Sequence, residues 1–501
     1  MTLRRNALVN LLGQIIAVVI SLATVPPLLR LVGDARYGVL LLVWVLLGYF
    51  SFFDLGVSQA TNQRMATLRD ANPGERSRLL WTALSMNGGL GLVAAAILYA
   101  VGYLVLGRFA SIDETLRMES LRALPWIAMA LPVNLIASVL GGALQGREAF
   151  ASVTVVNILG QLMAQCFPLL VAWRWSRSLE LLIPAALVAR GVTALLLGAA
   201  CRVLVPLRGV PRYDGVLGRK LLGYGGWVTV SAVVGPIMSS LDRVVIAGIA
   251  GSEAVTYYGV PQGLAQRLLM LPNSLSAALF PRFASSVPEQ RDALSEVSVR
   301  ILASVMTPAI VAGMFLVGPF LRIWISPAFA AKATLAAQII LAGVWMNGLA
   351  LIAHSSLQAR GRPDLVAKAH AVELPVYIAI LAGSLYQWGV AGAAIAWTVR
   401  VTGDAAVLFA LGGYLLRLGR RLAVPVLLLA LSLAAARALA GAPIAEGATG
   451  AALLLVAFGW GLRHFPWRLV RPGPSRTDVR IAKGAWPLPA PSRPPRSDGP
   501  R

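Results

Sequence analysis

Charged side chains occur in the middle of long apolar segments of this sequence, where a bilayer strongly disfavours charge. Four arginines and three carboxylates share this placement: Arg190, Arg243, Arg267, Arg400, Asp242, Glu373 and Asp404. A charge at the centre of a membrane helix costs about 3 kcal/mol on insertion scales, so such residues usually face a protein interior or a watery cavity. These seven residues are therefore the first candidates for a binding site.

The spacing of these charges limits how they can pair. Arg400 and Asp404 are four residues apart and share one helix face, so they can form an ion pair that is either structural or functional. Asp242 and Arg243 are adjacent and point in different directions, so at least one needs another partner. Arg267 has no acidic residue three or four positions away. It either lines a pocket for an anion or pairs with Asp242.

Side-chain amides form stripes along several of the same segments. At helical spacing they mark one face of each of four segments: Asn6, Asn10 and Gln14; Asn157, Gln161 and Gln165; Gln262, Gln266 and Asn273; Asn347, His354 and Gln358. Such stripes either join helices through hydrogen bonds or line a hydrophilic cavity that binds sugars. Their occurrence in both halves of the chain favours the cavity.

The elements that position these residues are membrane helices. Of the 501 residues, 57% are hydrophobic and only 13% are charged, and the mean hydropathy is +0.73. A soluble domain carries about a quarter charged residues, and a helix needs about 20 apolar residues to cross a bilayer. The apolar runs between residues 7 and 465 give about 14 such segments. We therefore predict an all-α polytopic membrane protein.

The distribution of basic residues explains the net charge of +23. Most Lys and Arg fall in alternate connections and in the two termini. This is the positive-inside bias, which predicts cytoplasmic N- and C-termini and argues against a nucleic-acid partner. Cys166 and Cys201 lie within apolar segments, and there is no phosphate-binding loop, zinc motif or catalytic triad signature. We expect no disulfide, no metal, no cofactor and no enzymatic activity.

An internal repeat divides the membrane part into two halves. Short matches recur in the same order at nearly the same offset: Arg36-Tyr-Gly-Val39 with Tyr257-Tyr-Gly-Val260, Leu144-Gln-Gly-Arg147 with Leu357-Gln-Ala-Arg360, and Arg190 with Arg400. This predicts two pseudo-symmetric six-helix bundles in residues 1–205 and 225–416, joined by a basic linker at 206–224. Two extra helices follow in 417–465, and 466–501 form a disordered Pro- and Arg-rich tail.

Several of these motifs resemble one known family. They are Asn10-Leu-Leu-Gly-Gln14, the segment ending in Gly33, Arg36-Tyr37-Gly38, Phe53-Asp54-Leu-Gly56, Leu241-Asp-Arg243, Tyr257-Tyr-Gly259 and Phe280-Pro-Arg282. The resemblance, over residues 1–420, is to the polysaccharide-biosynthesis flippases, which export O-antigen and exopolysaccharide units. Their superfamily also holds lipid II flippases and multidrug exporters.

The resemblance implies an alternating-access transporter of the bacterial inner membrane. Its substrate would be an undecaprenyl-diphosphate-linked oligosaccharide, moved from the inner to the outer leaflet. The arginines Arg190, Arg243, Arg267 and Arg400 would then hold the diphosphate, and Gln161, Gln262, Gln266 and Asn347 the sugars. Asp242, Glu373 and Asp404 would couple to H⁺ or Na⁺. Membrane lipids, and the polymerase and glycosyltransferases of the same pathway, would be partners.

Two other functions are weighed against this one. A multidrug exporter would need an acidic, aromatic cavity for cationic drugs, whereas here buried arginines offset the carboxylates. A membrane glycosyltransferase or polymerase would need a large outer loop, and the longest here, residues 108–122, is too short for a domain. Lipid II flippases keep arginines in the first helix, and residues 7–29 contain none, which favours the O-antigen or exopolysaccharide branch.

Overall fold

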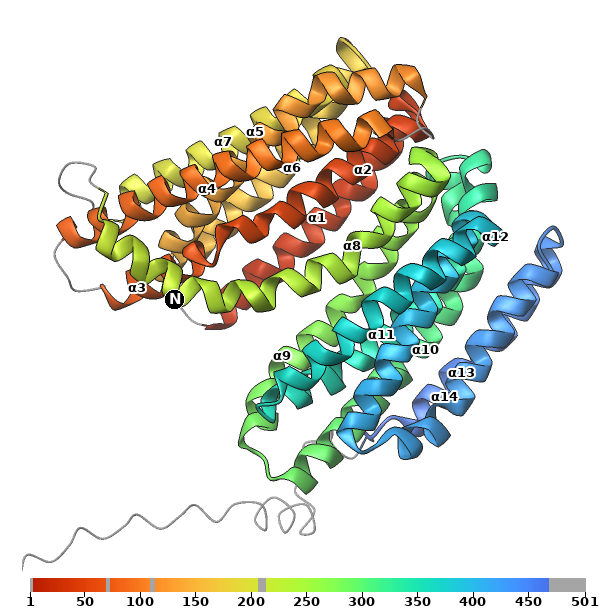
Figure 1. Cartoon of the computed structure of the whole chain (residues 1–501). Helices are drawn as coiled ribbons and strands as arrows, with labels where there is room; N and C mark the ends of the chain where they lie inside the picture. The colour runs from red at the N-terminus through yellow and green to blue at the C-terminus, as the bar shows by residue number, and fades with distance from the viewer. Residues whose placement is uncertain (1–2, 69–72, 109–112, 206–212, 468–501) are drawn as a thin grey trace, which may run out of the picture.

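The computed structural model describes residues 3–68, 73–108, 113–205 and 213–467, and this part of the chain is almost entirely helical (Figure 1). The first half contains α1 (Leu3–Val32), α2 (Asp34–Tyr49), the 3₁₀ turn η1 (Phe50–Asp54), α3 (Val57–Thr67), α4 (Pro73–Arg108), α5 (Glu114–Gly146), α6 (Phe150–Arg174) and α7 (Leu179–Leu204). The second half contains α8 (Gly215–Ala265), η2 (Gln266–Leu269), α9 (Met270–Ser285), α10 (Pro288–Trp324), α11 (Pro327–Ala359), α12 (Pro363–Gly412), α13 (Leu415–Ala438) and α14 (Pro443–His464).

Prolines and glycines fix where several of these helices begin, bend and end. Prolines stand in the first turn of α10, α11, α12 and α14, where a missing N–H costs nothing and the fixed φ suits a helix. α8 bends at Gly251, which has φ +83°, and α12 bends at Gly389, which has φ +55°. Glycine adopts these angles without the strain that a Cβ would bring. Each of these two helices therefore consists of two arms.

The arms account for the predicted number of crossing segments. We count the two arms of α8 and of α12 separately, and we count α3 and α9 together with the segments that precede them. The described residues then form 14 helical rods. Ten of the described helices are long and apolar enough to cross a membrane, and α12 counts once among them. The prediction of an all-α, multi-pass membrane protein is confirmed.

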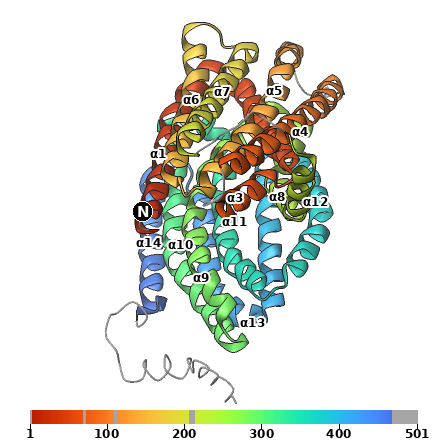
Figure 2. The ribbon, with the colours of Figure 1, turned by 90° about the vertical axis from the view of Figure 1, so that its left-hand side faces the viewer.

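The helices gather in two lobes (Figures 1 and 2). We call α1 to α7 the N-lobe, and the second arm of α8, η2 and α9 to α12 the C-lobe. α8 begins against α3 and α4 and then runs across to pack on α11 and α12. α13 and α14 lie at the edge of the C-lobe against α10.

The predicted domain boundaries fall near the ends of the two lobes. That the chain is divided into domains at these boundaries stays a prediction. α8 begins at Gly215, inside the predicted linker 206–224, because Asp214 caps the helix there through bonds from the N–H groups of Val216 and Leu217 at 3.0 and 3.1 Å. Residues 206–212, and the predicted tail from 468 onward, lie outside the described residues.

The repeated motifs occupy equivalent places in the two lobes. Arg147 is the C-cap of α5 and Arg360 is the C-cap of α11. Gly33, with φ +82°, separates α1 from α2 before Arg36-Tyr37-Gly38. Gly251 makes the corresponding bend in α8 before Tyr257-Tyr258-Gly259. Arg190 and Arg400 lie within α7 and the second arm of α12.

Candidate functional site

A cavity of about 330 Å³ lies between the two lobes. Its polar and aromatic lining comes from both lobes and comprises Ser21, Thr24, Tyr37, Trp44, Gln161, Gln165, Arg190, Arg267 and Trp324. None of the lining residues that the structure describes is acidic. We call this space the central cavity.

Two arginines give the central cavity its charge. Arg190, on α7, is partly buried, and its Nη1 donates to Asn134 Oδ1 on α5 at 2.8 Å. Since a guanidinium has five N–H donors, most of them remain for a ligand. Arg267, on η2, is exposed and has no ion-pair partner within the described part of the chain. The cavity therefore presents two positive groups to one space, which suits an anion.

A second cavity, of about 550 Å³, lies within the N-lobe and shares Gln161, Ala164 and Arg190 with the central cavity. We call it the N-lobe cavity. Side-chain amides and hydroxyls dominate its wall: Ser58, Gln59, Asn62, Asn134, Ser138, Gln145, Asn157, Gln161 and Thr193. The described lining contains no carboxylate here either. The two cavities together form a polar space that runs from the inner ends of α3 and α5 to the middle of the bundle.

One amide stripe of the sequence separates into two roles on α6. Asn157 and Gln161 line the N-lobe cavity. Gln165 instead accepts a hydrogen bond from Thr24 Oγ1 and so joins α6 to α1, although it also borders the central cavity. An amide stripe was expected either to join helices through hydrogen bonds or to line a cavity. On α6 both occur.

The lobes contact each other where α1 turns into α2 and where α8 bends. Thr256 Oγ1 donates to the carbonyl of Asp34 at 2.7 Å, and the Tyr257 hydroxyl donates to the Asp34 carboxylate. A Cβ on Gly38 would lie 1.8 Å from the Ser252 carbonyl oxygen, so only glycine permits this approach. We call this contact region the closed end.

Further contacts strengthen the closed end. Arg30 Nε donates to the Ile325 carbonyl at 3.0 Å, and Trp324 Nε1 donates to the Leu22 carbonyl at 2.7 Å. Arg36 forms a bidentate pair with Glu119, whose oxygens lie 2.9 and 2.6 Å from its Nε and Nη2. The central cavity is thus covered on the side that the charge pattern assigns to the outside.

Asp242, Arg243 and Gln262 form one buried network beside the central cavity. Asp242 accepts from the Tyr258 hydroxyl at 2.6 Å and from Gln262 Nε2 at 3.0 Å. Arg243 Nη2 donates to Gln262 Oε1 at 3.0 Å. Gln262 therefore bridges the two adjacent charges, and Asp242 does not pair with Arg267. Arg243 does not line the central cavity, although its Nε would be only 3.8 Å from a Cβ placed on the lining residue Gly259.

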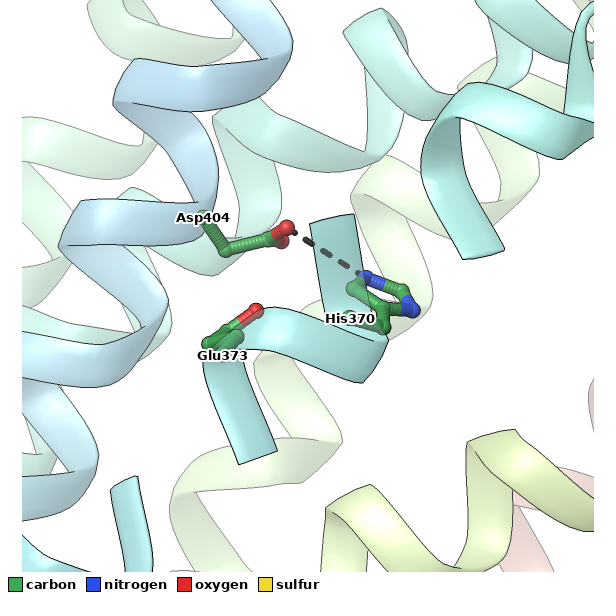
Figure 3. Close-up of side chains that lie close together, drawn as sticks. All are labelled: His370, Glu373 and Asp404. Atoms are coloured by element: carbon green, nitrogen blue, oxygen red, sulfur yellow. Dashed lines mark ion pairs between the residues drawn. The ribbon is translucent and has the colours of Figure 1, made fainter. Parts of the chain in front are cut away.

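A second charged cluster lies between the arms of α12 (Figure 3). His370 Nε2 lies 3.3 Å from Asp404 Oδ1, and Arg400 Nη1 lies 3.4 Å from Glu373 Oε1. Arg400 also lies over the ring of Tyr377, 5.2 Å from its centroid. Arg400 and Asp404 do not pair with each other as their spacing suggested, because each has a partner on the opposite arm. The ion pair between Arg400 and Asp404 that their spacing allows is therefore not formed.

This cluster could also hold a cation. His370, Glu373 and Asp404 each offer a ligand atom, and these atoms lie within 4.8 Å of one another. Glu373 and Asp404 border a cavity of about 580 Å³ whose remaining wall is mostly aliphatic. Arg400 stays with this cluster and does not line the central cavity.

The remaining predicted residues lie elsewhere. Gln266 is on η2 and Asn347 on α11, and neither lines the central or the N-lobe cavity. Asn10 and Gln14 belong to α1, but their side chains lie outside what the structure describes. Gly56, with φ +69°, turns the chain into α3, and Tyr37 lines the central cavity.

The motif residue Asp54 is a junction of hydrogen bonds. It accepts from Ser58 Oγ at 2.6 Å, from Asn87 Nδ2 at 2.5 Å and from Ser138 Oγ at 3.1 Å. These bonds tie α3, α4 and α5 together directly behind the N-lobe cavity. Ser58 and Ser138 line that cavity, whereas Asp54 does not.

Sequence reasoning missed some site residues. Spacing along the sequence did not point to His370 or Asn134, because their partners Asp404 and Arg190 are 34 and 56 residues away and meet them only in the folded bundle. The spacing His370-x-x-Glu373 places both on one helix face and was the available signal for the C-lobe cluster.

The comparison with known proteins agrees with this geometry. The family model described as "Polysaccharide biosynthesis protein" matches residues 3–287, more than half of the chain. This chain belongs to the polysaccharide biosynthesis protein family. The predicted family resemblance is confirmed, including for the segment that holds the motifs from Gly33 to Gly56 and from Asp242 to Gly259.

This polysaccharide biosynthesis protein has relatives of known name and structure. It is 27% identical over 418 residues to the "Putative O-antigen transporter" of Shigella flexneri, covering 81% of this chain and 97% of that protein. Its fold is similar to the lipid II flippase MurJ in an inward closed conformation, with a TM-score of 0.66, 11% identity, and coverage of 93% and 99% of the two chains. An inward-facing multidrug MATE transporter gives a TM-score of 0.60 at 15% identity, with coverage of 80% and 93%. These structural likenesses establish the fold.

Proposed function

We propose that this protein moves a polyprenyl-diphosphate-linked oligosaccharide from the inner to the outer leaflet of the bacterial inner membrane. The observation that carries the proposal is the central cavity, in which Arg190 of the N-lobe and Arg267 of the C-lobe line one space without an acidic residue in its described lining. A diphosphate is recognised by arginine through charge-assisted hydrogen bonds. The family and the O-antigen transporter relative support the same substrate class.

Alternating access supplies the transport mechanism. The closed end joins the lobes through Asp34, Thr256 and Tyr257, while the polar space continues towards the inner ends of α3 and α5. With both termini in the cytoplasm, as the charge pattern predicts, the structure corresponds to an inward-facing state. Breaking the closed end while the opposite ends of the lobes approach would expose the central cavity to the other side.

Coupling to H⁺ or Na⁺ is assigned, as part of this proposal, to Glu373 and Asp404. They are carboxylates within a membrane segment and meet His370 and Arg400 there. Asp242 is less suited to the role than predicted, because Tyr258 and Gln262 already satisfy its carboxylate. The predicted partners, a polymerase and glycosyltransferases of the same pathway, stay predictions.

Deletion of the gene and complementation with variants test the proposal. Lipid-linked repeat units are extracted, and their accessibility from each side of the membrane is measured. Arg190→Ala and Arg267→Ala should leave these units confined to the inner leaflet, whereas Arg463→Ala, an exposed arginine on α14, should complement fully. Normal export with both cavity variants at normal protein levels would remove the diphosphate assignment, and protection against cationic dyes would then point to drug export.

A further inference from the structure

We propose that the N-lobe cavity is the glycan subsite of this transporter, and that Asp54 sets the hydrogen-bonding character of its wall. The proposal rests on the function proposed above and adds where the sugars bind. It also gives a role to the Phe53-Asp54-Leu-Gly56 motif, which the diphosphate site does not use.

The wall of the N-lobe cavity is rich in uncharged hydrogen-bonding groups. The N-lobe cavity has a volume of about 550 Å³, within the range of about 300–1,000 Å³ for small-molecule sites. Its polar groups are neutral amides and hydroxyls apart from Arg190. Polar groups in a membrane protein are costly unless they find partners. Sugar hydroxyls donate and accept hydrogen bonds, so they complement such a wall better than a lipid chain or a cationic drug would.

Asp54 fixes the direction of two hydroxyl groups in this wall. An ionised carboxylate only accepts hydrogen bonds, so Ser58 and Ser138 donate their protons to it, at 2.6 and 3.1 Å. The Ser138 proton has a second acceptor in the Leu135 carbonyl, at 2.8 Å. In either case the serine protons point away from a ligand, and the oxygen lone pairs remain for it. This part of the wall therefore accepts hydrogen bonds from sugar hydroxyls.

Other wall residues supply donors. Arg190 donates a hydrogen bond to Asn134 Oδ1 at 2.8 Å, so the amide N–H groups of Asn134 remain available to a ligand. Asn62 Nδ2 donates to Gln145 Oε1 at 3.3 Å, which leaves the amide N–H groups of Gln145. The cavity thus offers fixed acceptors at Ser58 and Ser138 and fixed donors at Asn134 and Gln145. Such a pattern distinguishes among sugars by the positions of their hydroxyl groups.

Arg190 and Gln161 lie where the two cavities meet. Both residues line the central cavity and the N-lobe cavity. A diphosphate held between Arg190 and Arg267 therefore places its first sugar at this junction, and the following sugars extend into the N-lobe cavity. The described walls of both cavities lack carboxylates, so uronic acids and other acidic sugars are accepted as well as neutral ones.

Binding measured with two forms of one lipid tests this inference. The probes are polyprenyl diphosphate carrying the host's repeat unit, purified from the deletion strain, and the same lipid after removal of the glycan. The full chain in lipid nanodiscs should bind the glycosylated form more tightly. Asn157→Leu should reduce this preference at least about threefold and leave the affinity for the bare lipid unchanged. Asp54→Asn, whose amide N–H can donate a hydrogen bond to a serine oxygen, should also reduce the preference for the glycosylated lipid.

Thr402→Val serves as a matched control, because Thr402 is exposed on α12 and donates only to its own helix at the Thr398 carbonyl, 2.7 Å away. Asn157→Leu is the decisive variant, since it leaves the Asp54 bonds intact. An unchanged glycan preference in Asn157→Leu, with wild-type binding of the bare lipid, overturns the glycan subsite and leaves the proposed function standing. Failure of the wild-type chain to bind either lipid overturns the proposed function and this inference together.

Discussion

Arg190 and Arg267 approach one cavity from opposite lobes, with Arg190 held by Asn134 and Arg267 free of any carboxylate within the described chain. A ligand bound by both arginines must contact both lobes at once. A change in the distance between the lobes would then alter its binding, which is the requirement for a substrate that is released on the other side.

The first prediction concerns Gly38. Replacement by alanine would place a Cβ 1.8 Å from the Ser252 carbonyl oxygen, so the closed end must separate. We expect export to fall several-fold and a cysteine at position 256 to become more reactive towards a membrane-impermeant thiol reagent added from outside. Gly447→Ala is the control, because a Cβ there meets nothing within 4 Å. Equal reactivity in the two variants would contradict the assigned contact.

The second prediction concerns motion at the closed end. Asp34 and Thr256 touch through the bond from Thr256 Oγ1 to the Asp34 carbonyl. In a background with Cys166 and Cys201 replaced by serine, Asp34→Cys with Thr256→Cys should cross-link on mild oxidation. We expect the cross-link to stop export and a reductant to restore it. Continued export by the fully cross-linked protein would exclude opening at this end.

The third prediction separates a structural ion pair from a coupling site. The side chains of Arg400 and Glu373 are only 11% and 16% exposed. Removing one partner of a buried pair typically costs about 3 kcal/mol. Arg400→Leu should therefore lower the unfolding temperature in nanodiscs, and the double variant with Glu373→Leu should recover most of that loss. Calorimetric or fluorescence melting measures both.

Export in the same double variant then decides the role of the pair. A stable double variant that no longer exports would support coupling at Glu373. A stable double variant with normal export would make the pair purely structural. Arg362→Leu, which breaks the exposed pair with Asp364, provides a control of similar chemistry.

The fourth prediction concerns the charge of the central cavity. Arg267→Glu should abolish export of an anionic substrate, whereas Arg267→Lys should retain part of it, because lysine keeps the charge but loses the bidentate geometry. The measurement is the amount of surface polysaccharide relative to the amount of the protein in the membrane. We expect it to decrease from the wild type to Arg267→Lys and to be lowest in Arg267→Glu. Equal export by the lysine and glutamate variants would contradict an anion-binding role for Arg267.

Much of this architecture was predictable from the sequence because membrane helices are specified locally. Apolar length, the prolines that begin helices and the charge bias between loops all act within about 20 residues. The repeat was visible because Arg147 and Arg360 end equivalent helices. Arg190 and Gln161 were recognisable as cavity residues because apolar surroundings make buried polar groups conspicuous.

The remaining features depend on tertiary contacts that spacing does not reveal. Arg400 and Asp404 share a helix face, but the bend at Gly389 returns the chain so that Glu373 and His370 compete successfully for them. Gln165 follows Asn157 by eight residues, and with 3.6 residues per turn the stripe drifts around α6. Its end therefore meets Thr24 on α1 while its start faces the N-lobe cavity.

The most direct test of the central claim is where lipid-linked repeat units accumulate when the chain carries Arg190→Ala and Arg267→Ala. Each lost charge-assisted bond is worth about 1.5 kcal/mol or more, and 1.4 kcal/mol corresponds to tenfold in affinity. The account predicts at least about a tenfold fall in units accessible from the outer face, with accumulation on the inner face. Unchanged accessibility from the outer face, at normal levels of the variant in the membrane, would contradict it.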